Sequence, residues 1–158
     1  MTVICIPGSY DPVTLGHLSL IEQASRIGDL VYAAIFINPE KTYRFSLDER
    51  LELLRIATRP YPNVRVVSDG GTVADFARRN GVSFLLKGVR SEADFLYERE
   101  MADVNRARGV ETLLLPAHPA LREVSSSEVR RRLDAGEPEG GLLPPEVDFY
   151  LKTILNKP

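Results

Sequence analysis

Three segments of the sequence carry hydroxyl, glycine or histidine residues at points where a phosphate could bind. Near the N-terminus, Pro7-Gly-Ser-Tyr-Asp-Pro is followed by Thr14-Leu-Gly-His17, and late in the chain stands Ser125-Ser-Ser127. The last two segments lie where helices are expected to begin. The N-terminus of a helix presents unpaired N–H groups and a partial positive charge, so it favours bound anions. Both segments therefore predict phosphate-binding sites.

Basic residues fall in the same group of loops. Those in or beside segments that follow predicted strands are Lys41, Arg44, Lys87, Arg90 and Arg122. His17 adds an imidazole at the start of a helix, where the dipole disfavours the protonated ring but suits contact with an anion. The glycine before it permits close approach of the backbone to a ligand. Together these residues predict a site for a small polyanion, although the net charge of the chain is only −2.

The elements that must position these groups alternate between strand and helix. Short apolar runs predict buried strands over 3–6, 30–37, 64–68, 84–87 and 111–115, since parallel strands covered on both faces need not alternate. Amphipathic patterns predict helices over 17–26 and about 93–106, and further helices that begin at 46, 72, 125 and 144. This alternation predicts an α/β fold with a doubly wound, five-stranded parallel sheet of Rossmann-like type, in a single domain over 1–158.

Capping signals support several of the helix boundaries. Ser46 with Glu49 and Ser125 with Glu128 have the spacing of a capping box, in which the two residues satisfy each other's backbone N–H groups. Gly81 is expected to end the helix that begins at Thr72, because glycine adopts the left-handed conformation without strain. In a doubly wound sheet, ligands bind beyond the carboxyl ends of the strands, where the strand order reverses. The loops named above are therefore expected to share one site.

Composition excludes several classes of protein. The 158 residues include 20 Lys+Arg and 22 Asp+Glu, a balance that argues against nucleic acid or an anionic membrane as a partner. No basic segment precedes an apolar stretch at the N-terminus, so no secretory signal is expected. No apolar run approaches the ~20 residues needed to span a bilayer. The single cysteine, Cys5, excludes an internal disulfide and fits a reducing compartment, so the predicted location is the cytoplasm.

Some conspicuous residues are expected to be structural. His118 lies in a proline-rich stretch, and Cys5 lies on a predicted buried strand. The run Arg130–Arg132 is interpreted as a solvated helix face rather than as a nucleic-acid patch. The sequence also lacks a Ser/His/Asp or Cys/His arrangement for nucleophilic catalysis.

The motifs, in their order and spacing, resemble those of the bacterial phosphopantetheine adenylyltransferases. Thr14-Leu-Gly-His17 is similar to the signature of the wider nucleotidylyltransferase superfamily, and a narrower likeness lies in Lys87-Gly-Val-Arg90 followed by Asp94-Phe-Leu-Tyr-Glu98. The resemblance covers nearly the whole chain. It implies transfer of the adenylyl group of ATP to 4′-phosphopantetheine by direct in-line attack, giving dephospho-coenzyme A and pyrophosphate. It also implies Mg²⁺ carried with ATP and a homohexamer.

The resemblance further implies roles for individual residues. The catalytic pair would be His17 and Lys41. Residues on the acceptor side would be Ser9, Lys41, Val73 and Lys87. Residues that bind ATP would be Ser9, Tyr10, His17, Gly88, Val89, Arg90, Glu98, Leu121, Arg122, Glu123, Val124, Ser125, Ser126 and Ser127. No protein ligand for a metal ion is expected.

Three departures from the family pattern leave alternatives open. Lys87 stands where the family usually has arginine, Leu121-Arg-Glu-Val124 replaces a more aromatic approach to the serines, and Thr42-Tyr43 replaces a Lys-Pro pair. All three touch substrate contacts. One alternative is adenylyl or cytidylyl transfer to another phosphorylated acceptor, such as a pyridine mononucleotide. The other is a nucleotide-binding module without catalysis.

Overall fold

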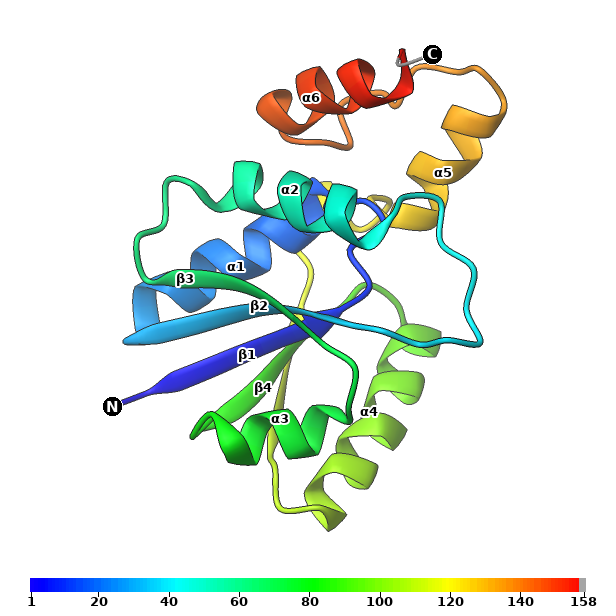
Figure 1. Cartoon of the computed structure of the whole chain (residues 1–158). Coiled ribbons are helices and arrows are strands. Elements are labelled where there is room, and N and C mark those ends of the chain that lie inside the picture. The colour runs from blue at the N-terminus through cyan, green and yellow to red at the C-terminus, as the bar shows by residue number, and fades with distance from the viewer. Residues whose placement is uncertain (157–158) are drawn as a thin grey trace.

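The computed structural model describes residues 1–156 of the chain. Strands and helices alternate along it (Figure 1). In chain order the elements are β1 (Val3–Gly8), α1 (Leu15–Ile27), β2 (Leu30–Phe36), α2 (Leu47–Thr58), β3 (Val64–Asp69), α3 (Val73–Arg79), β4 (Phe84–Val89), α4 (Glu92–Ala107), β5 (Thr112–Pro116), the 3₁₀ turn η1 (Pro119–Leu121), α5 (Ser126–Asp134) and α6 (Pro145–Leu155). In this part of the chain, no helix is both long and apolar enough to cross a bilayer.

The strands form one parallel sheet in the order β3-β2-β1-β4-β5. The chain therefore builds outward from β1 to β3, returns to the middle, and builds outward again through β4 and β5. This arrangement confirms the predicted α/β fold with a five-stranded parallel sheet. The strand order reverses between β1 and β4, which is where a doubly wound sheet binds its ligands.

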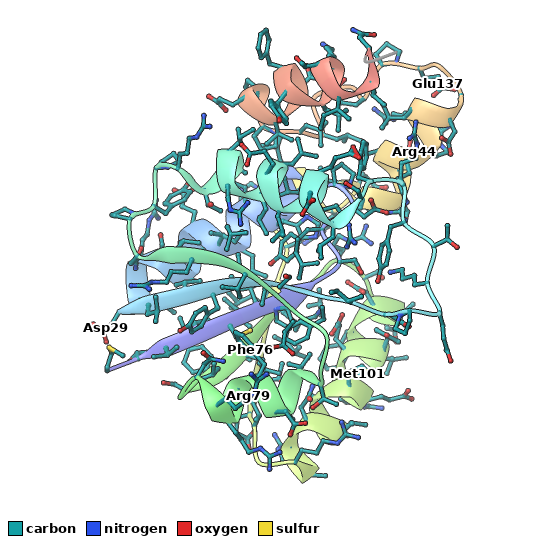
Figure 2. All side chains as sticks on the ribbon, viewed as in Figure 1. Asp29, Arg44, Phe76, Arg79, Met101 and Glu137 are labelled. Atoms are coloured by element: carbon teal, nitrogen blue, oxygen red, sulfur yellow. The ribbon has the colours of Figure 1, made fainter. Side chains whose placement is uncertain are left out.

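Helices cover both faces of the sheet. Helices α1 and α2 lie on one face with α5 and α6 beyond them, and α3 and α4 lie on the other (Figure 1). The larger core joins the first face to the helices and includes Ile4, Ile21, Leu53 and Val147. The smaller core centres on Phe76 of α3, which Figure 2 shows against the sheet. Each such buried side chain contributes about 1.5–3 kcal/mol through removal of apolar surface from water.

β1 and β4, the strands between which the strand order reverses, are joined by a short ladder. β1 pairs with β2 through six residue pairs, from Val3↔Leu30 to Gly8↔Ile35. It pairs with β4 only through Ile4↔Phe84 and Cys5↔Leu85. Beyond those two pairs, the carboxyl ends of β1 and β4 run without a shared ladder, and the space between them opens toward the loops that carry the predicted site.

Most predicted boundaries agree with the structure within a few residues, but two expectations about helix starts were wrong. Helix α1 begins at Leu15, two residues before the predicted start at His17. At α5, Ser125 accepts from the Glu128 N–H, but the Glu128 carboxylate pairs with Arg131 and Arg132 instead of completing the capping box. The predicted capping box of α2 and the left-handed glycine at Gly81 are both present.

Candidate active site

A cavity of about 530 Å³ lies at the end of the sheet where β1 and β4 separate. This volume is in the range of sites that hold small molecules and cofactors. The basic and hydroxyl-bearing residues that line the cavity come from the loop after β1, α1, the loop after β2, β4 and its loop, α4, and α5 with its N-cap. They are Ser9, Tyr10, Thr14, Ser19, Lys41, Lys87, Arg90, Tyr97, Ser125, Ser126, Ser127 and Arg130, with His17 and His118 among the remaining lining residues.

His17 completes the N-terminal cap of α1. The Thr14 side chain accepts from the His17 N–H, while the Thr14 N–H donates to His17 Nδ1 at 3.0 Å. A ring nitrogen that accepts from a backbone N–H carries no proton of its own, so the proton of the neutral ring lies on Nε2. The ring lines the cavity. Nε2–H is therefore a fixed hydrogen-bond donor at the base of the site.

Tyr10 supports the imidazole from one side. Its ring lies 4.7 Å from the His17 ring, measured between centroids, and its hydroxyl donates to the carbonyl of Ile6 at 2.7 Å. Tyr10 is buried, and its φ of +48° lies in the left-handed region that residues other than glycine rarely adopt. The hydroxyl is thus engaged with the backbone, and the ring holds His17 in place.

The site keeps His17 uncharged. Burial, together with the positive charges of Lys87 and Arg90, lowers the pKa of His17 from 6.5 to about 4. At neutral pH the ring is then neutral and donates from Nε2 without repelling its own cationic neighbours. A histidine with this pKa is suited to hydrogen bonding to an anion, and at neutral pH it would not serve as a general acid in its protonated form.

This shift predicts a pH dependence of stability. As pH falls from 6.5 toward 4, the unfolded chain binds a proton at His17 that the folded chain does not, so folded wild type loses stability. The loss amounts to at most about 3 kcal/mol. The matched control is His17→Gln. Glutamine does not titrate, and it is one of the usual residues at the third helical position of a capping box. Denaturant unfolding of both proteins between pH 4 and 8 should show wild type gaining stability relative to the variant as pH rises from 4, with no further gain well above pH 6.5. A difference that is constant with pH would contradict the lowered pKa.

Lys41 lies on an exposed segment between β2 and α2. Its Nζ donates to the Ser9 hydroxyl at 3.2 Å, which joins the loop after β2 to the loop after β1. Because Ser9 directly follows β1, the ammonium is held at the edge of the same cavity that His17 lines. A lysine in this position is a mobile point charge with three donors, suited to contact two anions at once.

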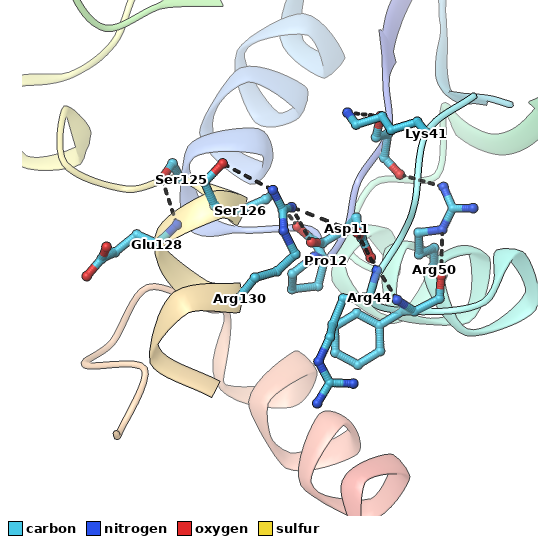
Figure 3. A network of polar contacts seen from close by, with 12 residues as sticks. Asp11, Pro12, Lys41, Arg44, Arg50, Ser125, Ser126, Glu128 and Arg130 are labelled. Carbon is cyan, nitrogen blue, oxygen red and sulfur yellow. Dashed lines mark hydrogen bonds and ion pairs between the residues drawn. The ribbon is translucent and has the colours of Figure 1, made fainter. Parts of the chain in front are cut away.

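Asp11 fastens the same two loops together and joins them to α5. Its carboxylate is buried and accepts from the N–H groups of Arg44 and Phe45, at 2.8 and 2.9 Å. The Arg130 guanidinium donates to the Asp11 carbonyl at 2.8 Å and lies 3.8 Å from its carboxylate (Figure 3). Ser126 adds a hydrogen bond from its hydroxyl to the carbonyl of Pro12 at 2.7 Å. The N-terminus of α5 is thereby held against the loop that carries Ser9.

The N-terminus of α5 is directed at the cavity. Ser125, Ser126 and Ser127 all line it, and the first N–H groups of a helix have no acceptor within the helix. On the other side, the Arg90 guanidinium donates to the carbonyl of Arg122 at 3.3 Å. This contact links the loop after β4 to the segment that leads into α5. Serine hydroxyls, helix N–H groups and a guanidinium therefore surround one part of the cavity.

Lys87 and Glu98 form an ion pair at another wall of the cavity. The Lys87 Nζ lies 3.5 Å from the Glu98 carboxylate and donates to the carbonyl of Pro7 at 3.4 Å. Glu98 is the buried residue of α4. Burial raises its pKa, while Lys87 opposes that rise. Arg90 makes other contacts: its guanidinium donates to the carbonyl of Arg122, and its backbone N–H donates to Asp94.

The cavity brings together most of the residues predicted from the sequence. Those that line it are Ser9, Tyr10, His17, Lys41, Lys87, Gly88, Arg90, Glu98, Leu121, Val124, Ser125, Ser126 and Ser127. Val73, Val89, Arg122 and Glu123 lie outside the lining. Val73 begins α3 and packs against the smaller core. Assignments of ligand contacts to these residues remain predictions.

The sequence reasoning missed three groups at the site. Arg130, interpreted as part of a solvated helix face, lines the cavity beside Ser127. Asp11 was named only as a member of the Pro7-Gly-Ser-Tyr-Asp-Pro motif, and its contact with Arg130, 119 residues away, is invisible to any local pattern. His118 caps η1 through a bond from the Ala120 N–H to its Nδ1, as a structural residue would, but it also lines the cavity.

The carboxylates of the cavity are already engaged with donors. Asp11 accepts from backbone N–H groups, Asp94 accepts from the Arg90 N–H, and Glu98 pairs with Lys87. Within residues 1–156, no three His, Cys, Asp or Glu side chains are grouped so that they could hold a metal ion. The donor groups that face the cavity are those that bind phosphates. The arrangement can hold a polyphosphate and a second anion side by side.

Comparisons with known proteins agree with this chemistry. The chain matches the family model described as cytidylyltransferase-like over residues 5–132, which span all residues that line the cavity. It is 46% identical over 141 residues to the phosphopantetheine adenylyltransferase of Symbiobacterium thermophilum, covering 88% of this chain and 87% of that relative. It is 42% identical over 142 residues to the phosphopantetheine adenylyltransferase of Streptomyces coelicolor, covering 89% of each chain.

Proposed function

The chain belongs to the phosphopantetheine adenylyltransferase family, and from that premise we propose that it transfers the adenylyl group of ATP to 4′-phosphopantetheine. The products are dephospho-coenzyme A and pyrophosphate. The observation that carries the proposal is the neutral His17 donor and the Lys41 ammonium at one cavity, beside the serine-rich N-terminus of α5. Two anions held there would meet with their charges offset by fixed donors.

The reaction needs no enzyme nucleophile. An oxygen of the acceptor phosphate forms a bond to the α-phosphorus of ATP, and the bond from that phosphorus to the oxygen leading to the β-phosphate breaks. Pyrophosphate leaves with the electron pair. The second pKa of a phosphate monoester is about 6, so the attacking group is mostly ionised at neutral pH and needs no base. Catalysis then consists of alignment and of donors aimed at the charge that develops.

The proposed roles rest on the geometry of the cavity for the residues that line it, and on the family resemblance alone for Val73, Val89, Arg122 and Glu123. His17 donates from Nε2 to an α-phosphoryl oxygen, and Lys41 bridges that group and the incoming phosphate. Ser9 contacts both substrates. The ATP phosphates lie against Arg90 and the N-terminus of α5, where Arg130 also lies. Residues proposed for the remaining nucleotide contacts are Tyr10, Gly88, Val89, Glu98, Leu121, Arg122, Glu123 and Val124, and those for the acceptor are Val73 and Lys87.

Magnesium is proposed to enter as part of the substrate, bound to ATP. Mg²⁺ keeps several waters and prefers phosphate oxygens to a protein cage, which suits a cavity whose carboxylates are already engaged. Bound to ATP, the ion would offset charge on the pyrophosphate group. The protein contributes the surrounding donors of Arg90 and α5. We also propose a cytoplasmic location, to which the single, buried Cys5 adds support.

One assay tests the function and its alternatives. The protein is incubated with ATP and Mg²⁺ and with 4′-phosphopantetheine or nicotinamide mononucleotide in parallel, and pyrophosphate release is measured. Turnover with 4′-phosphopantetheine alone is the expected result. Turnover only with the pyridine mononucleotide would show that this compound, and not 4′-phosphopantetheine, is the acceptor. ATP binding without turnover in either arm would identify a non-catalytic nucleotide-binding module.

Lys87→Ala is expected to weaken acceptor affinity more than ATP affinity. A charge-assisted hydrogen bond to a phosphate is worth about 1.5–3 kcal/mol, or roughly tenfold or more in binding. The change also leaves the buried Glu98 without its ion-pair partner, which would repel an incoming phosphate. Titration calorimetry with each substrate measures the two affinities separately. Equal losses for ATP and acceptor would contradict the placement of Lys87 on the acceptor side.

We further propose that the chain assembles as a homohexamer. Helix α4 supports this, since its exposed side carries Tyr97, Met101 and Val104 at 61%, 40% and 44% exposure. Their spacing places them on one side of the helix. Exposed apolar surface of this kind favours contact with another protein chain. Light scattering should give six times the mass of one chain, and a monomeric mass at micromolar concentration would exclude this assembly.

A further inference from the structure

Arg50 is a buried arginine that has no carboxylate partner in the part of the chain that the structure describes. It lies on the first turn of α2 and exposes 3% of its surface. None of the ion pairs among residues 1–156 includes it. Arginine is almost never fully buried without a partner, because removing its charge from water is costly. Its position therefore calls for a specific account.

The guanidinium is held by two carbonyl groups and one aromatic ring. Nε donates to the carbonyl of Phe45 at 3.2 Å, and Nη1 donates to the carbonyl of Ser9 at 3.0 Å (Figure 3). Its central carbon lies 3.9 Å from the centroid of the Tyr43 ring. This distance is well within the range of a cation–π contact. Arg50 thus contacts the loop after β1 and the loop after β2 at once.

Both of these contacts lead to the Ser9–Lys41 pair. Ser9 accepts from Arg50 through its carbonyl and from Lys41 Nζ through its hydroxyl. On the other loop, the Tyr43 hydroxyl accepts from the Asn38 N–H at 3.2 Å, so this ring bridges the segment that contains Lys41. That segment is otherwise exposed between residues 37 and 42. Few other contacts fix where Lys41 lies.

We propose that Arg50 is a positioning residue, which holds the Ser9 carbonyl and the Tyr43 ring so that Lys41 stays in place at the reacting phosphates. Arg50 is not among the residues that line the cavity, so it acts through its neighbours rather than on the substrate. The inference rests on the proposed function. Arginine suits the position, because its planar fork can bond two carbonyls in a fixed geometry while its face stacks on a ring, whereas the ammonium of lysine has no plane to stack and no fixed fork.

Arg50→Lys tests the inference, because it keeps the charge and loses the fork. We expect kcat to fall roughly tenfold or more, since a misplacement of about 1 Å can cost as much as 10²-fold. KM for ATP should stay within about threefold, because the groups that bind ATP are intact, whereas KM for the acceptor should rise, because Lys41 also holds the incoming phosphate. The matched control is Arg55→Lys, on the same helix, whose side chain is 55% exposed and pairs with Glu52. The control should leave kcat and both KM values unchanged.

A double-mutant cycle with Lys41→Ala separates positioning from a general structural effect. If Arg50 acts through Lys41, Arg50→Lys should lower kcat less than about twofold once Lys41 is absent. Equal losses in both backgrounds would overturn the inference. So would a variant with wild-type kcat. A wild type without turnover would overturn the proposed function as well, so the two failures are distinguishable.

A second variant covers the case in which Arg50→Lys does not fold. Tyr43→Leu removes the stacked ring from the exposed side of the same contact and leaves the buried guanidinium with its two carbonyls. We expect the same pattern, a lower kcat with KM for ATP nearly unchanged and a loss that disappears in the Lys41→Ala background. Thermal melts followed by circular dichroism show that the compared proteins are folded. Unchanged kcat in folded Tyr43→Leu would overturn the inference.

Discussion

Replacing His17 with alanine is expected to lower kcat by about 10²- to 10³-fold, the usual cost of removing one donor aimed at a developing oxyanion. The donor is Nε2–H, which the bond from the Thr14 N–H to Nδ1 turns toward the cavity. Because the ring stays neutral at neutral pH, it adds little attraction for the ground-state phosphates. KM for ATP and for the acceptor should therefore change only a few-fold. Steady-state pyrophosphate release, with each substrate varied in turn, measures all three constants.

His17→Gln is the control that separates the donor from the helix cap. Glutamine is one of the two ordinary residues at the third position of a capping box, so it can still accept from the Thr14 N–H. Glutamine has no imidazole ring, so it cannot place the ring Nε2–H at the cavity. The glutamine variant should keep the thermal stability of α1 better than alanine but lose activity to a similar extent. Activity within a few-fold of wild type in either variant would remove His17 from the reaction.

Replacing Lys41 with alanine should lower kcat as much as His17→Ala does, but should also raise KM for the acceptor. Lys41 is proposed to contact both the incoming phosphate and the α-phosphoryl group, so its loss is felt in the ground state and in the transition state. We expect kcat to fall about 10²- to 10³-fold and KM for the acceptor to rise, while KM for ATP changes little. The split between the two KM values distinguishes Lys41 from His17.

The matched control for Lys41 is Lys152 of α6. That side chain is 65% exposed and pairs with Asp148, far from the residues that line the cavity. Lys152→Ala removes the same charge from the chain and should leave the kinetics unchanged. If Lys41→Ala raised KM for ATP and the acceptor equally with kcat intact, Lys41 would be only a general anchor for anions.

The sheet could be predicted because each strand contains a short run of mainly apolar residues between turn residues or charged residues, a local pattern that the sequence shows directly. Even the edge strands Val64–Asp69 and Thr112–Pro116 lie within two residues of the expected ranges, although neither contains the fully buried residues that were expected. The start of α1 was placed too late for a local reason. Sequence rules look for Glu or Gln as the reciprocal partner in a capping box, whereas here the partner is His17.

The parts of the site that could not be predicted depend on contacts distant in sequence. Arg130 occurs in a run of three arginines, and nothing local distinguishes it from Arg131, which pairs with acids on the surface. Its partner Asp11 lies more than a hundred residues earlier. Arg50 likewise reads as an ordinary charged residue of an amphipathic helix. Residues that bind ligands sit on motifs, but residues that hold the motifs together are found only when the chain is folded.

The short ladder between β1 and β4 has a consequence for the whole molecule. Two residue pairs join the half built on β1, β2 and β3 to the half built on β4 and β5, and the cavity opens where that ladder stops. A nucleotide bound there would contact both halves and would bridge β1 and β4, the neighbouring strands that share the fewest residue pairs. The substrates would therefore stiffen the protein most at the line along which its backbone is least connected.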